Sequence, residues 1–324
     1  MKSSKKMFVL TEAVLAVMVA ITAIGMLWGQ NEEKKGKVSV IVNDSDADRW
    51  AAFKYGLRMA AQDEEIALFI VNMGEGLTAE EEKEAIENEI ANGADAVIVQ
   101  PVPGEDTQEM IRRLKKKVPI ILVEDSAGGG TKEADLPVVK LDDRAVGQAL
   151  AEELLKDYNG KVQGKTLGLV SGCGTSKAIQ ERKKGIISAL EGMGVKVVWE
   201  VTDSSKGEED EILERKSKVD FVAALDNHSL VLAGRAAAAN NLHGALVYGV
   251  GNSMEAVYCL DTDYVQCLIA PDDFDMGYQS LLGAAKSFGH IFRRAKSRTV
   301  GYTVMRKENL FSKENQEILF AMSQ

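Results

Sequence analysis

Five carboxylates lie on loops after predicted strands, which is where open α/β sheets bind their ligands. They are Asp46, Glu124, Asp125, Asp226 and Asp272. Arg49 is the main opposing charge, and its neighbour Trp50 carries an indole ring. Carboxylates accept paired hydroxyl groups and attract amines or Ca²⁺. An indole covers the apolar face of a sugar or stacks on a planar or cationic ligand. This set predicts a site for a polyol, a sugar or a cationic small molecule.

Each of these features has an alternative explanation. Large aromatic side chains are usually buried, so Trp50 can simply pack against its own helix. Loop carboxylates also serve as helix caps or as solvated surface. A third alternative is that the site has lost its ligand altogether.

Enzymatic sites are less well supported. The segment SGCGTSK, residues 171–177, is rich in glycine but lacks the GxxxxGK[ST] spacing that wraps phosphates. Cys173 on this loop and His228 could approach each other, yet no oxyanion donor or orienting carboxylate accompanies them. His243 and His290 have no metal-ligand spacing. We therefore expect no catalysis, no metal and no cofactor.

Composition narrows the class of protein. The chain has 324 residues, with 39 Lys and Arg against 49 Asp and Glu, a net charge of −10. An acidic chain without a basic block lacks the charge that nucleic-acid binding needs, so no nucleic acid is expected. The length predicts two lobes. Cys259 and Cys267 are eight positions apart, and a disulfide outside the cell or two packed thiols are equally compatible with that spacing.

The N-terminus resembles a membrane signal-anchor. After Lys2, Lys5 and Lys6, residues 8–28 are apolar apart from Glu12, and 21 residues just span a bilayer core of about 30 Å. The positive flank places the N-terminus in the cytoplasm and the rest outside. We expect residues 1–29 to be a Lys-rich stub and membrane span in the cell membrane, and residues 30–36 to be a tether. Cleavage of the segment as a signal peptide is the alternative.

Strands and helices alternate through the rest of the chain. Continuous apolar strands imply parallel sheets that are covered on both faces. The predicted strands start at Val38, Ile66, Ala96, Pro119, Thr166, Val195, Phe221, Ala245 and Val265. Two such blocks predict an α/β fold of two doubly wound parallel-sheet lobes.

The order of several motifs resembles the ribose-binding-protein type of periplasmic solute-binding protein (type I) from Lys37 to about Asn309. These motifs are VSVIVNDSDADRWAAFKYGLRMAA, NGADAVIVQPV, VPIILVEDS, LDDRAVGQALAEELL, GTSKAIQERKKGI, FVAALDNHSLVLAG and VYGVGN. The resemblance implies three crossings between the lobes, near Leu141 to Asp142, near Pro271 and near Val300. Lobe 1 would comprise residues 37–141 plus 272–298, and lobe 2 residues 142–271 plus 299–324.

The resemblance also implies positions for the ligand site, and this chain departs from the family there. An aromatic pair at the first helix is replaced by Arg49 and Trp50, and an Asp-Arg pair by Glu124 and Asp125. An arginine expected in the helix after Ser176 aligns with Gln180. Specificity for ribose therefore does not carry over. The expected ligand-binding residues are Asp46, Arg49, Trp50, Glu124, Asp125, Gln180, Asp226 and Asp272.

Proteins of this type close around one small ligand. The resemblance implies an extracytoplasmic, sugar-binding protein that presents its ligand to an ABC permease. Two alternatives remain open, which are a ligand-sensing auxiliary protein for a membrane sensor histidine kinase and a ligand-free structural adaptor.

Overall fold

The structure is a computed structural model that describes residues 15, 17–19, 35–44, 48–74, 76–124, 136–172, 176–202, 209–288 and 295–324. The chain divides into two units, residues 1–35 and residues 36–324, and both lobes belong to the second. Leu15 and Val17 to Val19 are helical and exposed, and the rest of the expected span at 8–28 lies outside the described residues. Within the described residues, no helix combines the length and hydropathy needed to cross a bilayer.

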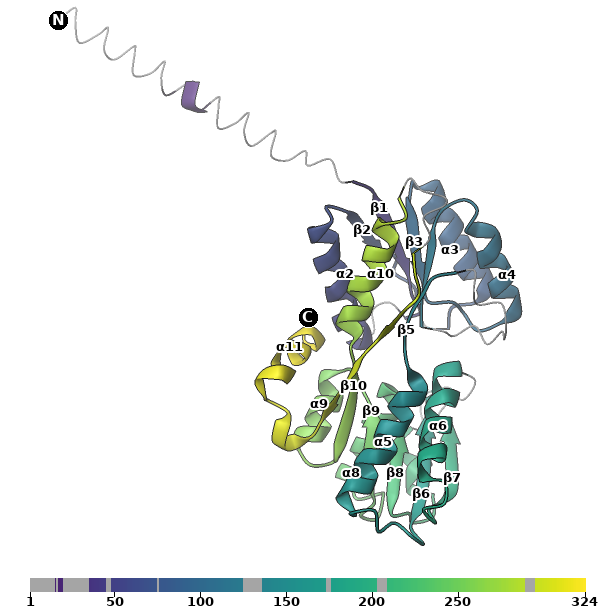
Figure 1. Ribbon diagram of the computed structural model, residues 1–324, viewed down its shortest axis with the longest axis vertical. Coiled ribbons are helices and arrows are strands. Elements are labelled where there is room, and N and C mark those ends of the chain that lie inside the picture. Colours follow the sequence, from purple (N-terminus) through teal and green to yellow (C-terminus); the bar gives the residue numbers. More distant parts are fainter. Residues whose placement is uncertain are drawn as a thin grey trace, which may run out of the picture. The chain divides into compact units, whose positions relative to one another are not determined.

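The first lobe is built on a six-stranded, fully parallel sheet in the order β11-β5-β4-β3-β1-β2 (Figure 1). Its strands are β1 (Lys37–Ile41), β2 (Ala67–Ile70), β3 (Ala96–Val99), β4 (Ile120–Val123), β5 (Val138–Leu141) and β11 (Arg298–Val300). Helices α2 (Ala51–Asp63) and α10 (Asp273–Ala285) cover one face, and α3 (Ala79–Ala91) and α4 (Glu105–Leu114) cover the other. All four residues of β3 are buried, as a strand covered on both faces requires.

The second lobe repeats this plan with one difference. Its sheet has the order β12-β10-β9-β8-β6-β7, and β12 runs antiparallel to β10. The strands are β6 (Thr166–Ser171), β7 (Lys196–Thr202), β8 (Phe221–Ala224), β9 (Leu246–Val250), β10 (Cys267–Pro271) and β12 (Tyr302–Met305). Helices α5 (Asp143–Asp157) and α6 (Lys177–Leu190) pack on one face, and α7 (Glu209–Glu214), α8 (Asn227–Ala238) and α9 (Met254–Asp261) lie on the other.

Each lobe contains a pair of helices in very close contact. A Cβ added at Gly56 of α2 would lie 2.0 Å from the carbonyl oxygen of Phe274 in α10. In the second lobe, a Cβ added at Gly147 of α5 would lie 1.9 Å from the carbonyl oxygen of Arg182 in α6. Real Cβ atoms do not approach that closely, so glycine is what permits both helix pairs to form.

Three short connections join the lobes. Asp142 alone separates β5 from α5, Asp272 alone separates β10 from α10, and Gly301 alone separates β11 from β12. Both aspartates cap the helix that follows, because their carboxylates accept the backbone N–H of Ala145 and Asp275 at 3.0 Å. The backbone N–H of Asp272 donates to the carbonyl of Gly301 at 3.0 Å, which ties the second crossing to the third.

The last helix contacts both lobes. After β12 and a short 3₁₀ turn at Lys307–Asn309, α11 (Lys313–Met322) returns to pack against α2 of the first lobe (Figure 1). The ring of Phe320 meets that of Tyr55 in α2 edge to face, with centroids 5.7 Å apart. Met322 is buried in the core of the second lobe. The segment that we expected to lie entirely in lobe 2, residues 299–324, thus also contributes Val300 to the first sheet and Phe320 to the first lobe.

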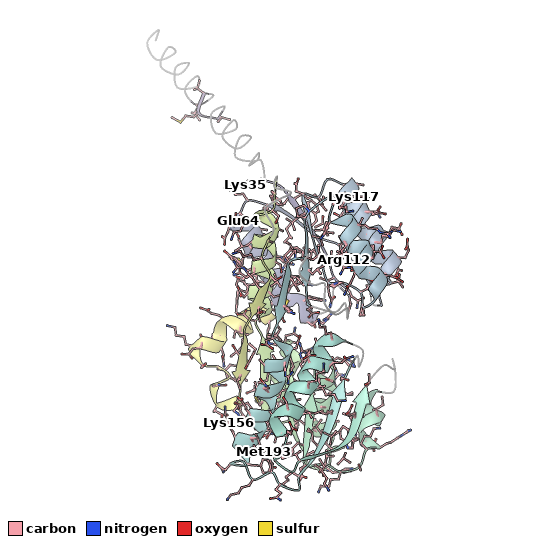
Figure 2. The ribbon with its side chains drawn as sticks, turned by 45° about the vertical axis from the view of Figure 1, so that its right-hand side comes forward. Lys35, Glu64, Arg112, Lys117, Lys156 and Met193 are labelled. Atoms are coloured by element: carbon pink, nitrogen blue, oxygen red, sulfur yellow. The ribbon has the colours of Figure 1, made fainter. Side chains whose placement is uncertain are left out.

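Figure 2 draws the side chains as sticks and labels Arg112 and Lys117 of the first lobe and Lys156 and Met193 of the second. Cys259 and Cys267 are both free and buried, so the two-thiol alternative describes this structure. Burial raises the pKa of both thiols, that of Cys267 to about 12.

Candidate functional site

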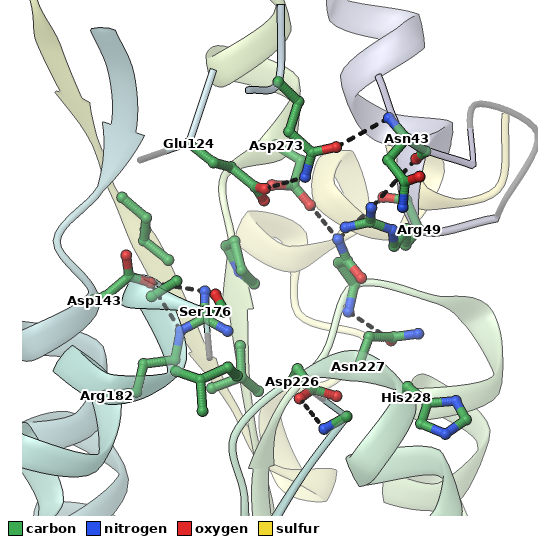
Figure 3. Close-up of a pocket in the computed structure, with 18 of the residues that line it drawn as sticks. Asn43, Arg49, Glu124, Asp143, Ser176, Arg182, Asp226, Asn227, His228 and Asp273 are labelled. Carbon is green, nitrogen blue, oxygen red and sulfur yellow. Dashed lines mark hydrogen bonds and ion pairs between the residues drawn. The ribbon is translucent and has the colours of Figure 1, made fainter. Parts of the chain in front are cut away.

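A cavity of about 480 Å³ lies between the two lobes, at the carboxyl ends of the strands. Loops after β1, β3 and β4 form its first wall, and loops after β6, β8 and β9 form its second. Figure 3 shows the charged side chains gathered around it. The charged residues that line it are Arg49, Glu124, Asp143, Arg182, Asp226 and Asp273.

A chain of hydrogen bonds orders the first wall. The backbone N–H of Asn43 donates to Oε1 of Gln100 at 3.1 Å, and Nε2 of Gln100 donates to Oε2 of Glu124 at 2.6 Å. Glu124 has a φ of +56°, a left-handed conformation that is uncommon for a residue with a side chain. Backbone strain of about 1 to 3 kcal/mol is typical of binding sites, where the surrounding structure holds it in place.

Trp50 supports Arg49 and does not face the cavity. Its side chain is 3% exposed, its Nε1 donates to the carbonyl of Asn43 at 3.1 Å, and its ring lies 5.2 Å from that of Phe53. The guanidinium carbon of Arg49 lies 4.3 Å above the Trp50 ring. The indole face that we expected to carry a ligand therefore carries an arginine.

An ion pair orders the second wall. Nε of Arg182 donates to Oδ1 of Asp143 at 2.8 Å, and NH1 donates to the carbonyl of Leu225 at 2.8 Å. Burial raises the pKa of Asp143, and the charge of Arg182 opposes that shift. Nearby, Asp226 caps α8 by accepting the N–H of Ser229, and its other oxygen accepts the N–H of Gly172 at 2.7 Å.

Asn252, which follows β9, connects the two lobes. Its Nδ2 donates to the carbonyl of Arg49 at 3.0 Å and to Oδ2 of Asp273 at 2.5 Å, both in the first lobe. Its backbone N–H donates to Oδ1 of Asn227 in the second lobe at 3.0 Å. Asp273 is 8% exposed, and burial raises its pKa to about 7.

The structure brings three of the expected residues to the cavity, namely Arg49, Glu124 and Asp226. Gln180 is exposed and lies off the cavity wall, and Asp272 is occupied as the cap of α10. Asp46 and Asp125 lie outside the described residues.

Asp143, Arg182, Asn252 and Asp273 also line the cavity but were not among the expected ligand-binding residues. Asp143 and Asp273 directly follow the crossing residues Asp142 and Asp272, and Arg182 lies two positions after Gln180. The expected residues Asp272 and Gln180 are therefore one and two positions away from residues that face the cavity. Among the described residues, no cluster of histidine, cysteine or acidic side chains has the arrangement of a metal site.

Known proteins share this architecture. Residues 38–286 match the family described as periplasmic binding protein domain. A carbohydrate transporter solute binding protein from Agrobacterium radiobacter, solved with D-arabinose, superposes with a TM-score of 0.75 at 18% identity, over 89% of this chain and 99% of that one. GanP, a glucose-galactose binding protein from Geobacillus stearothermophilus, gives 0.72 at 18% identity, over 86% and 100%.

A third solved structure is a XylFII-LytSN complex, with a TM-score of 0.72 at 15% identity over 85% of this chain and 98% of that one. Comparison with curated proteins finds no match. Since the family match covers most of the chain and agrees with two doubly wound lobes around one cavity, the protein belongs to the periplasmic binding protein domain family.

Proposed function

We propose that this protein is an extracytoplasmic binding protein that closes on one small, sugar-like ligand. The observation that carries the proposal is the cavity of about 480 Å³ whose walls come from both lobes. Its lining of carboxylates, guanidinium groups and side-chain amides suits a ligand with many hydroxyl groups, because these groups accept and donate paired hydrogen bonds. Structural neighbours were solved with D-arabinose, D-tagatopyranose and D-fucose, which supports a sugar-like ligand.

Closure follows from the placement of the site. A ligand that touches Glu124 of the first lobe and Arg182 of the second gains all of its contacts only when the lobes are together. It therefore stabilises the closed arrangement by its differential affinity for that state. Binding alone explains the site, and the proposal includes no catalytic step.

Presentation to an ABC permease is the first use that we propose for the closed form. A second use, as the ligand-sensing partner of a membrane sensor histidine kinase, is favoured by the similarity to the XylFII-LytSN complex, in which a structurally similar chain is bound to another protein. The apolar segment at residues 8–28 stays a prediction, and it would hold the protein at the membrane in either case.

Titration calorimetry and small-angle scattering of the full chain test the proposal. We expect heat of binding and a smaller radius of gyration with a member of a panel of neutral sugars, polyols, amines and anionic sugars. Glu124→Gln should weaken binding, whereas Glu109→Gln, on the exposed side of α4, should leave it unchanged. Unchanged scattering across the whole panel would leave only the ligand-free adaptor.

A further inference from the structure

Four of the described residues that line the cavity carry carboxylates. Two are bound by an arginine or by backbone N–H groups, and the other two have no cationic partner. Asp143 is paired with Arg182 at 2.8 Å, and Asp226 accepts two backbone N–H groups. Glu124 and Asp273 receive hydrogen bonds only from neutral amides, those of Gln100 and Asn252, among the interactions of the described residues. The cavity therefore holds two acidic groups whose negative charge no direct ion pair in this part of the chain neutralises.

Glu124 and Asp273 lie on the same wall of the cavity, close enough for the charge of Glu124 to act on Asp273 (Figure 3). Burial raises the pKa of Asp273, and the charge of Glu124 adds to that effect, whereas the hydrogen bond from Asn252 and the charges of Arg49 and Arg182 oppose it. Neither arginine replaces a direct partner, because Arg49 lies on the Trp50 ring and Arg182 is bound to Asp143.

Asn252 adds a third acceptor at the same place. Its Nδ2 is occupied by the carbonyl of Arg49 and by Asp273, while its Oδ1 is buried and accepts no hydrogen bond. The orientation of the amide follows from its neighbours, since both partners of Nδ2 are acceptors. A buried acceptor without a donor is costly, and a donor from the ligand would remove that cost.

We propose that the ligand carries a protonated amine, as an amino sugar or an aminated polyol does, and that this group binds between Glu124, Asp273 and Asn252. The inference rests on the proposed function and specifies its ligand. An ammonium group supplies three donors, no acceptor and one positive charge, which matches the two carboxylates and one amide oxygen. A neutral sugar supplies the hydrogen bonds without the charge, and an anionic sugar is repelled.

Stability of the protein without added ligand gives a first test that requires no knowledge of the ligand scaffold. Asp273→Asn keeps an oxygen that can accept from Asn252 and removes the buried charge, so it should raise the melting temperature by a few degrees at about pH 8. Glu124→Gln should do the same. Asp143→Asn is the matched control: it leaves Arg182 without its carboxylate and should lower the melting temperature.

Binding to matched ligand pairs gives the second test. The pairs are D-glucosamine with D-glucose, D-glucamine with D-sorbitol, and putrescine with 1,4-butanediol, so that each pair differs by ammonium groups in place of hydroxyl groups. We expect the amine to bind at least tenfold more tightly in the pair that fits the cavity. For glucamine or putrescine, affinity should rise roughly tenfold from about pH 6 to about pH 8, because binding expels the proton of Asp273. Asp273→Asn should abolish this pH dependence.

The outcomes separate the inference from the proposed function. Binding and closure with a neutral member at equal or higher affinity would overturn the inference and leave the proposed function intact. A loss of stability in Asp273→Asn and Glu124→Gln as large as in Asp143→Asn would also overturn it, since the two carboxylates would then not be uncompensated. An absence of binding and closure with these six compounds and with the whole panel of neutral sugars, polyols, amines and anionic sugars would overturn both.

Discussion

The close contact between α2 and α10 makes the sharpest prediction about packing. A Cβ added at Gly277 of α10 would lie 2.1 Å from the carbonyl oxygen of Phe53 in α2, whereas ordinary contacts begin near 3.4 Å. Gly277→Ala must therefore separate the helices by about 1.3 Å. Overpacking of this kind costs about 1 to 3 kcal/mol, and the better helix propensity of alanine returns about 1 kcal/mol of that at most. We expect a net loss of about 1 kcal/mol in the free energy of unfolding, the mid-range cost of about 2 kcal/mol less about 1 kcal/mol.

Gly283 on the same helix provides the control. A Cβ there would lie 3.5 Å from the Cβ of Ala295, an ordinary contact, so Gly283→Ala should be neutral or stabilise by about 0.5 kcal/mol. Urea unfolding followed by circular dichroism measures both variants. Ligand affinity should fall in Gly277→Ala alone, because α10 begins at Asp273 and α2 follows Arg49. Equal stability of the two variants would refute the close-contact argument.

Three further predictions concern charge and the last helix. Burial raises the pKa of Glu82, which is fully buried, to about 8, so the protein should lose stability as the pH rises from about 4.5 to about 8, and urea midpoints of Glu82→Gln should lack that part of the loss. Phe320→Ala should change ligand affinity measured by calorimetry, because its ring, although 55% exposed, meets Tyr55 of the first lobe, whereas Phe311→Ala, which removes a 64% exposed ring before α11 begins, should not. Arg306→Ala should lower the free energy of unfolding by about 2 kcal/mol, because the nearly buried Glu153 keeps Lys156 but loses the charged hydrogen bond from Arg306; a thermal midpoint like that of the unaltered chain would contradict this.

Periodicity was sufficient to predict most of the fold. The apolar runs that begin near Val38, Ala96, Thr166 and Phe221 are buried strands in the structure. Such a run places apolar side chains on both faces of the strand, so both faces must be covered. The antiparallel strand β12 was not predicted. Its four residues carry no alternation, and its direction is set by the crossing at Gly301 and not by local pattern.

The site was predicted at the level of loops but not of side chains. Glu124, Asp226 and Arg49 follow strand ends and line the cavity. Asp272 and Asp273 are adjacent acidic residues after one strand, and only the backbone geometry decides that the first caps α10 while the second faces the cavity.

The same limit applies to Arg182 and Gln180 in α6. Two positions on a helix differ by about 200° in direction, so an alignment that pointed to Gln180 placed the side chain on the solvent face and missed Arg182. Asn252 was not singled out as a ligand-binding residue, because its role depends on the approach of two lobes that are distant along the chain.

The three one-residue crossings restrict how this molecule can move. Few torsion angles separate the two rigid bodies, and the aspartates at two of the crossings also hold the first turns of α5 and α10. Sliding of one lobe past the other would break those caps, so the remaining freedom amounts to little more than turning about a single axis. A receptor or permease that docks across both lobes would consequently sense one variable, an angle, whatever the chemistry of the molecule enclosed between them.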